Sequence, residues 1–197
     1  MIGAVMPKVV DHKQRRRELV DASWDVIVDS GIDGLTLRNV ARAAHCSTGR
    51  ISHYFANREA LLSAALVAVH RSAAARMNAI ANSEQPARDQ LRQIALEALP
   101  LDDHRLREWK VWMVFWAAAA KDKDLAALNR QRYAEWRGLI RRLTAELSPT
   151  EANDFKAEEL ISLIDGLGLR ITLNPDRANR HMAVSMIDRW LESALHQ

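Results

Sequence analysis

Large aromatic side chains gather in one stretch of the chain, WKVWMVFWAAAA, which begins at Trp109. Trp109, Trp112 and Trp116 are spaced by three and four residues, so a helix would carry them on one face, with Phe115 on an adjoining face. Tyr133 adds a further ring in the next helical stretch. Aromatic residues at this spacing usually pack in a core, but they can also line a ligand pocket. The spacing leaves both interpretations open.

One acidic residue lies in apolar surroundings. Asp165 stands in the run 160–167, in which leucine and isoleucine predominate. A carboxylate is rarely buried without a partner. Asp165 is therefore a hydrogen-bonded helix residue, the ion-pair partner of Arg170 or Arg141, or part of a ligand site.

Polar side chains dominate another stretch, STGRISHYF at residues 47–55. Ile51 and Phe55 are four residues apart, so a helix would turn both toward a core and leave the polar residues on its outer face. Arg50 has the planar fork that pairs with the O6 and N7 atoms of guanine. Gly49 would let the backbone approach a phosphate closely. Such a face suits contact with DNA, although an ordinary solvated helix face is the alternative.

Three helices are expected to position this polar face. The first runs from about Lys13 to Ser30 and ends at Gly31, because glycine adopts the left-handed conformation of a helix C-terminus without steric cost. Thr36 and Ser47 are favourable N-caps for the second and third helices. The order of helix, tight turn and helix predicts a helix-turn-helix, which places its second helix in the major groove of DNA.

This arrangement selects the expected DNA contacts. Phosphate contacts fix the position of a protein on DNA, whereas side chains that reach base edges read its sequence. The predicted contact residues are Arg38, Ser47, Thr48, Gly49, Arg50, Ser52, Tyr54 and Arg58. A basic arm at 1–12 is expected to follow the minor groove. One such unit reads only a few base pairs, so we expect a twofold dimer on a palindromic, double-stranded DNA operator.

The segment GIDGLTLRNVARAAHCSTGRISHYFANREALL at 31–62 resembles the DNA-binding segment of the tetracycline-repressor (TetR) family. The likeness spans about residues 13–66. The turn departs from the family pattern, because His45-Cys46 stands where glycine and an apolar residue are usual. Histidine tolerates the left-handed conformation better than most residues, so the turn should survive with some loss of stability.

The remainder of the chain is expected to be helical. No stretch alternates apolar and polar residues, and 48% of the residues are apolar, which favours an all-α fold with a sizeable core. Helices are predicted at about 57–81, 86–99, 103–120, 122–147, 148–173 and 177–195. The family resemblance implies nine helices in this order. It divides the chain into a DNA-binding domain at 1–56 and a ligand-binding and dimerisation domain at 57–197.

Stretches in both halves resemble the choline-responsive repressors of betaine synthesis, the BetI group of this family; they are MPKVVDHKQRRRELVDA, STGRISHYF, KVWMVFWAAA and LIDGLGLR. The first of these stretches begins at Met6, so Met6 is an alternative start of translation. The resemblance implies a choline-like quaternary ammonium effector, held by aromatic faces at about 0.5–2 kcal/mol per contact and by a carboxylate. The predicted ligand residues are Trp109, Trp112, Phe115, Trp116, Tyr133 and Asp165. Trp109 and Gly168 depart from the pattern of the group, with Gly168 in place of a bulky aromatic residue, so a different ligand volume is expected.

The last two helices are the expected homodimer interface. They offer the apolar residues Leu163, Leu167, Met182, Met186 and Trp190. Two copies of the pair would form a four-helix bundle, as the resemblance also implies. The alternative is that this apolar stripe packs only on its own domain.

Several classes of function are disfavoured. The sequence contains no GxSxG, Gly-rich phosphate loop or HExxH, and its histidines lack metal-ligand spacing, so we expect no enzyme activity, cofactor or metal. The longest apolar run, 111–120, is too short to cross a bilayer, which takes roughly 20 residues. The single cysteine, Cys46, fits a reducing cytoplasm. We predict a soluble cytoplasmic repressor. One alternative is a repressor that responds to a lipophilic or acyl ligand, and another is an architectural protein that binds DNA without sequence preference.

Overall fold

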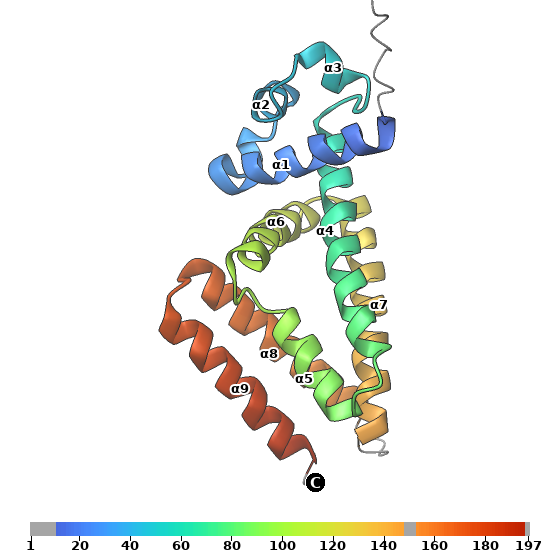
Figure 1. Cartoon of the computed structure of the whole chain (residues 1–197), viewed down its shortest axis with the longest axis vertical. Coiled ribbons are helices and arrows are strands. Elements are labelled where there is room, and N and C mark those ends of the chain that lie inside the picture. Colours follow the sequence, from blue (N-terminus) through green and yellow to red (C-terminus); the bar gives the residue numbers. More distant parts are fainter. Residues whose placement is uncertain (1–10, 148–152, 196–197) are drawn as a thin grey trace, which may run out of the picture. The chain divides into compact units, whose positions relative to one another are not determined.

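The computed structural model describes residues 11–147 and 153–195, and every regular element within these ranges is an α-helix (Figure 1). The helices are α1 His12–Gly34, α2 Leu37–Ala43, α3 Thr48–Ser52, α4 Arg58–Ala81, α5 Ala87–Glu97, α6 Asp103–Ala119, α7 Lys123–Leu147, α8 Asn153–Leu173 and α9 Arg177–Leu195. The predicted all-α fold is confirmed, and no helix of this part of the chain is long and apolar enough to cross a membrane. Residues 1–10 of the predicted basic arm, the alternative start and the predicted beginning of α8 lie outside the described residues.

The chain divides into two compact units, Met1–Ala65 and Leu66–Gln197. The boundary falls within α4, whereas the predicted domain boundary stands at the start of this helix. One continuous helix therefore contributes residues to both units.

Local capping interactions define the helices of the first unit. The Thr36 hydroxyl accepts a hydrogen bond from the backbone N–H of Asn39 at 3.1 Å, which satisfies one of the free donors at the start of α2. α1 bends at Gly31, where φ is 64° and ψ is −168°, a combination almost confined to glycine. The expected helix end at Gly31 is therefore a bend, after which one further helical turn leads to Gly34.

The core of the first unit is built from the inner faces of its helices. Leu19, Ile27, Val40, Ile51 and Phe55 are buried, so the predicted inward pairing of Ile51 with Phe55 is confirmed. Trp24 is also buried, and its indole N–H donates to the carbonyl of Ala65 at 3.2 Å.

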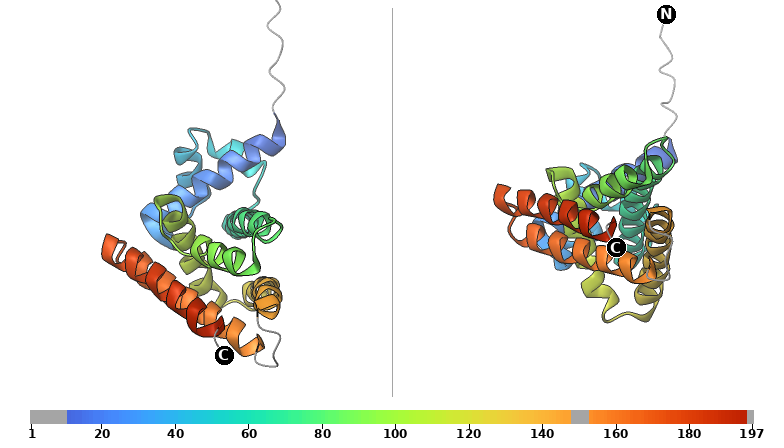
Figure 2. Two further views of the ribbon diagram at one scale, coloured as in Figure 1. Left: turned by 60° about the horizontal axis from the view of Figure 1, so that its bottom comes forward. Right: turned by 90° about the horizontal axis from the view of Figure 1, so that it is seen from below.

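The second unit has a separate core, to which α5, α7, α8 and α9 contribute most. Its fully buried residues include Ile94 from α5, Ile140 from α7, Leu160 from α8 and Ile187 from α9. α8 packs on α7 and on α9, and Figure 2 shows α8 and α9 side by side in opposite directions. α6 packs on α7 and α8, which brings the tryptophan-rich helix next to the helix that carries Asp165.

Candidate ligand pocket and DNA-binding face

α3 presents the polar face that the sequence predicts. Its N-cap Ser47 accepts a hydrogen bond from the backbone N–H of Arg50 at 3.3 Å, and Ile51 anchors the helix in the core. The predicted contact residues Arg38, Ser47, Thr48, Gly49, Arg50 and Ser52 are all exposed. An exposed guanidinium and an exposed glycine on one short helix fit contact with base edges and phosphates.

Two of the predicted contact residues are engaged within the protein. Arg58 donates from Nε to the carbonyl of Leu35 at 2.9 Å and from Nη2 to the carbonyl of Ile32 at 2.7 Å. It therefore ties the start of α4 to the link between α1 and α2, a role that the predicted DNA contact did not include. The half-buried Tyr54 pairs its hydroxyl with Nδ1 of His12 at 3.2 Å.

The turn between α2 and α3 takes the conformation expected for glycine, although histidine occupies it. His45 has a φ of 50°, the only positive value among the described residues other than glycine. Cys46 continues the turn by donating its N–H to the carbonyl of Ala41 at 2.8 Å. A left-handed histidine is less strained than most residues but more strained than glycine.

The second unit contains a cavity of about 350 Å³, which lies in the range of small-molecule sites. Five of the six predicted ligand residues line it, Trp109, Trp112 and Trp116 from α6, Tyr133 from α7 and Asp165 from α8. The remaining wall residues are His70, Ala73, Ala74, Met77, Asn78, Ala98, Asn129, Arg132, Glu135, Trp136, Leu139 and Ile164. Four helices, α4, α6, α7 and α8, thus contribute most of the wall.

The tryptophan rings form a continuous aromatic surface. Trp112 stacks on Trp116 with ring centroids 6.3 Å apart, and Trp109 meets Trp116 edge-on at 5.5 Å. Phe115 does not line the cavity; it is buried behind Trp112, with ring centroids 5.9 Å apart. The structure therefore assigns Phe115 a supporting position.

Asp165 is bonded to Tyr133 across the cavity wall. The Tyr133 hydroxyl donates to Oδ2 of Asp165 at 2.6 Å. Burial raises the pKa of Asp165, and the hydrogen bond from Tyr133 only partly opposes this. Burial and the neighbouring carboxylate both raise the pKa of Tyr133, which therefore stays protonated.

The arginines considered as partners of Asp165 are occupied elsewhere. Arg170 donates to Asn179 at 3.0 Å, and Arg141 pairs with Asp154 at 2.6 Å. Among the residues that the structure describes, Asp165 forms no ion pair.

Sequence reasoning missed a second charged group in the wall. Arg132 donates to Glu135 at 3.0 Å, and Nε2 of His70 lies 3.5 Å from the same carboxylate. Hydrogen bonding to Arg132 lowers the pKa of Glu135, whereas burial and then Arg132 lower the pKa of His70. Arg132 and Glu135 pair with each other, so Asp165 is the acidic group of the wall that has no basic partner among the described residues. Their i, i+3 spacing on α7 predicts an ion pair but not its place beside a cavity.

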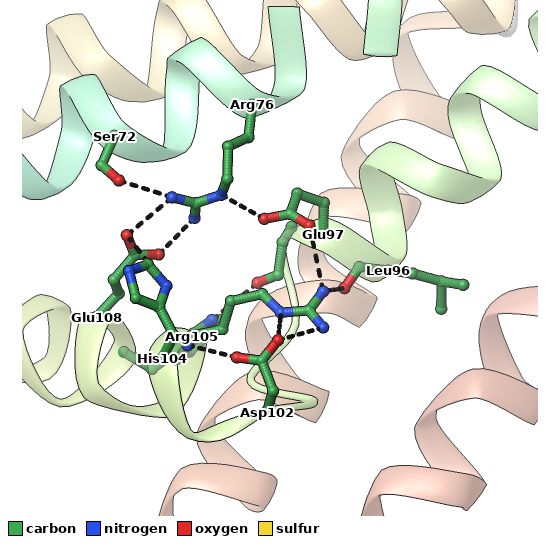
Figure 3. A network of polar contacts seen from close by, with 10 residues as sticks. Ser72, Arg76, Leu96, Glu97, Asp102, His104, Arg105 and Glu108 are labelled. Atoms are coloured by element: carbon green, nitrogen blue, oxygen red, sulfur yellow. Dashed lines mark hydrogen bonds and ion pairs between the residues drawn. The ribbon is translucent and has the colours of Figure 1, made fainter. Parts of the chain in front are cut away.

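A partly buried cluster of charges, of which Glu108 is the buried member, fixes the beginning of α6 (Figure 3). Arg76 of α4 donates to both oxygens of Glu108, at 3.1 and 2.6 Å, and to Glu97 of α5 at 2.5 Å. Arg105 bonds the other oxygen of Glu97 at 3.3 Å and pairs with the N-cap Asp102 at 2.8 Å. Burial alone would lower the pKa of Arg76, but its hydrogen bonds to Glu108 and Glu97, which accept from the guanidinium, outweigh burial and raise the pKa. The cluster joins α4, α5 and α6 on a face next to the aromatic wall.

The predicted dimer residues differ in exposure and fall into three groups. Leu167 is buried in the core of its own unit, and Leu163, Met182 and Trp190 are half-buried. Met186 is exposed, with 40% of its surface accessible. Three further large apolar residues of α8 are exposed and were not anticipated, namely Phe155, Leu169 and Leu173.

Comparisons with known families agree with both halves of this description. Residues 19–65 match the model of bacterial regulatory proteins of the tetR family, and residues 87–196 match the model of the BetI-type transcriptional repressor, C-terminal. The chain belongs to the TetR family of transcriptional regulators, with a BetI-type C-terminal part. It is thus a DNA-binding regulator with a helix-turn-helix, not an enzyme.

Curated relatives cover nearly the whole chain. The chain is 34% identical to the HTH-type transcriptional regulator PksA of Bacillus subtilis, over 95% of this chain and 93% of that protein. It is also 34% identical to the HTH-type transcriptional regulator BetI of Cronobacter sakazakii, over 96% of this chain and 95% of that protein.

Solved structures share the fold. A transcriptional regulator from Rhodococcus superposes with a TM-score of 0.83 at 26% identity, over 92% of this chain and 96% of that one. A putative regulator from Saccharomonospora viridis, crystallised in complex with choline, gives a TM-score of 0.84 at 21% identity, over 91% of this chain and 96% of that one.

Proposed function

We propose that the chain is a dimeric repressor that binds a palindromic operator through α3 and is released from it by a choline-like cation. One observation carries the proposal for the ligand: the carboxylate of Asp165 faces an aromatic-walled cavity and has no cationic partner among the described residues. The choline in the regulator from Saccharomonospora viridis and the identity to BetI support the same choice.

The chemistry of the wall suits a quaternary ammonium. Such a group cannot donate a hydrogen bond, so it is held by the faces of aromatic rings and by Coulomb attraction. A ring face contributes about 0.5–2 kcal/mol, depending on how well the cation is desolvated. Trp112, Trp116 and Tyr133 offer the rings, and Asp165 offers the charge.

Two polar atoms favour a ligand that also carries a hydroxyl group. Nε1 of Trp116 and Oδ1 of Asn129 belong to residues of the cavity wall, and both atoms are buried without a hydrogen-bond partner. A hydroxyl group can accept from the first and donate to the second. Choline has such a group, whereas simple tetraalkylammonium ions do not.

For the DNA contacts we propose Arg50 as the residue that reads a base. Arg38, Ser47, Thr48, Ser52 and Tyr54 would contact phosphates or sugars, with Gly49 allowing close approach. Arg58 would act indirectly, by holding the link between α1 and α2 through its two carbonyl contacts.

Dimerisation would pair α8 and α9 of two chains. The exposed Leu169, Leu173 and Met186 supply apolar surface for this contact, and Leu163, Met182 and Trp190 would extend it. Two recognition helices held one DNA turn apart, about 34 Å, would then read two half-sites. Because its target is DNA, we place the repressor in the cytoplasm.

Release would follow from a shift between two populations of the dimer. α4 contributes His70, Ala74 and Met77 to the cavity wall and continues into the first unit. A cation that binds more tightly to one arrangement of α6 against α4 would favour that arrangement and draw the recognition helices out of register. A ligand with equal affinity for both arrangements would have no effect.

The proposal is tested by selecting an operator from a random duplex library and measuring its affinity for the protein at matched salt. Selection of a palindrome that is preferred over other duplexes by orders of magnitude is the expected result. Similar affinity for every duplex would contradict it and indicate an architectural protein. Calorimetric titrations with choline, benzyltrimethylammonium and decanoate then separate a choline-like ligand from a lipophilic or acyl one.

A further inference from the structure

The indole ring of Trp109 fills the space that a side chain at residue 168 would need. A Cβ atom at Gly168 would lie 2.0 Å from both Cη2 and Cζ2 of Trp109, and 2.6 Å from Cζ3. Real side chains do not approach so closely, so the indole of Trp109 fits only because residue 168 has no side chain. The two residues come from different helices, α6 and α8.

The other sides of the Trp109 indole are also fixed. Its Nε1–H donates to the carbonyl of Ala98 at 2.8 Å, and its ring meets Trp116 edge-on at 5.5 Å. The side chain is buried, yet it forms part of the cavity wall. Displacement by a methyl group at residue 168 would therefore break the bond to Ala98, disturb Trp116 or move the ring into the cavity.

The backbone does not explain the glycine. Gly168 lies inside α8, without a positive φ, where glycine is less favourable than alanine. A Cβ atom at Gly166, two positions earlier in the same helix, would meet nothing within 4 Å apart from its chain neighbours and the backbone of its own helix. Packing against Trp109 thus distinguishes Gly168 from its neighbour, and Gly166 provides a matched control.

We propose that the Gly168–Trp109 pair determines the size of cation that the cavity accepts. Trp109 is the specificity-determining residue, because its ring closes one side of the cavity against groups larger than a compact trimethylammonium head. Gly168 is a positioning residue that acts through Trp109. This inference rests on the proposed function, since it assigns the ligand selectivity of the same site.

The experiment uses the full chain and four variants, Gly168→Ala, Gly166→Ala, Trp109→Ala and the double variant of Gly168→Ala with Trp109→Ala. Calorimetry gives the Kd of each protein for choline and for benzyltrimethylammonium, and thermal unfolding reports on the fold. We expect Gly168→Ala to weaken choline binding at least tenfold and to lower the unfolding temperature. Gly166→Ala should change choline binding less than twofold and should not lower the unfolding temperature.

Removal of the indole should change which cation is preferred. In Trp109→Ala the Kd of benzyltrimethylammonium divided by that of choline should fall at least tenfold relative to the wild-type protein. In this background Gly168→Ala should have less than a twofold further effect, because the group that it displaces is gone.

Equal choline binding by Gly168→Ala and Gly166→Ala, or an unchanged ratio in Trp109→Ala, would overturn the inference. If Gly168→Ala does not fold, folding of the double variant would support the contact and its failure to fold would overturn it. If the wild-type protein binds neither cation, the proposed function and the selectivity both fail. Unfolding of the four variants would then show whether the packing contact itself exists.

Discussion

The two units of the chain build their sites in different ways. The DNA-binding face depends on local interactions, such as the Ser47 cap on Arg50, three residues away, and the turn at His45. The cavity depends on distant ones: Tyr133 and Asp165 are 32 residues apart, and so are Arg76 and Glu108. The DNA-binding face can therefore be predicted from residue spacing and capping residues, whereas the cavity forms only when separate helices pack together.

The largest effect is expected at Glu108, the buried member of the charge cluster in the second unit. Glu108→Ala removes a buried carboxylate that accepts two bonds from the guanidinium of Arg76. Because Arg76 is 31% exposed and keeps its bond to Glu97, we expect a loss of about 3 kcal/mol of unfolding free energy, the lower end of the range for breaking a buried pair. Urea denaturation measures this loss.

The matched variant Asp188→Ala removes a bidentate partner of Arg92, but in a pair that is about 40% exposed, with side-chain values of 41% and 38%. The loss of unfolding free energy in Asp188→Ala should be at most about 1 kcal/mol. If Glu108→Ala and Asp188→Ala lose the same unfolding free energy, burial of Glu108 does not strengthen its ion pair, which would contradict this prediction.

The next effect concerns DNA. Arg50→Ala should weaken binding to the selected operator by about 1–3 kcal/mol and relax the sequence preference at one position of each half-site. Thr48→Ala should weaken binding uniformly across sequences, because a phosphate contact carries no base preference. A uniform loss with Arg50→Ala would remove this residue from base recognition.

Asp165 gives the ligand site a defined dependence on pH. A cation favours the ionised carboxylate, so choline affinity should be highest at neutral pH and should fall as the pH drops through the raised pKa of Asp165. The fall should therefore begin at a higher pH than for an ordinary aspartate. His70, whose pKa is lowered, would gain charge in the same direction.

Asp165→Asn isolates the contribution of the carboxylate. It keeps an oxygen for the Tyr133 hydroxyl, and it should reduce choline affinity about tenfold, or 1.4 kcal/mol, at neutral pH. Choline affinity is measured by calorimetry over a pH series, and an Asp165→Asn variant with the same pH dependence as the wild-type protein would contradict the role of Asp165.

The raised pKa of Asp165 also affects the stability of the wild-type protein. Ionised Asp165 destabilises the fold, so the stability that this group contributes decreases as the pH rises through that pKa.

The smallest effect is expected in the local turn of the first unit. His45→Gly should raise the unfolding free energy by about 0.5–1 kcal/mol, because glycine takes a φ of 50° without the strain of a side chain. Thermal unfolding at matched conditions measures the gain. A loss of stability would show that the imidazole makes a contribution larger than the strain.

The contrast between the units also explains what could be predicted from the sequence. Helix starts at Thr36 and Ser47 were predictable because a hydroxyl cap acts within three residues. The tryptophans of α6 were placed on one face because helical spacing is regular. Even Asp165 could be selected, since a carboxylate among leucines needs a partner.

The features that sequence reasoning missed depend on packing between helices. Tyr133 and Asp165 were predicted to share one site, but nothing in the order of residues predicts the hydrogen bond between them. Nor does it predict the burial of Leu167 or the contact of Arg58 with the carbonyl of Leu35. The departures at Trp109 and Gly168 were visible separately, but their direct contact required the arrangement of α6 on α8.

The central claim is that a choline-like cation in the aromatic cavity controls DNA binding. The most direct measurement is the fluorescence anisotropy of a labelled, selected operator duplex bound to the protein and titrated with choline at constant ionic strength. The account predicts saturable release in the micromolar to millimolar range for the wild-type protein, and a marked shift to higher choline concentration for Asp165→Asn. Persistent binding at saturating choline, or identical release from the two proteins, would contradict it.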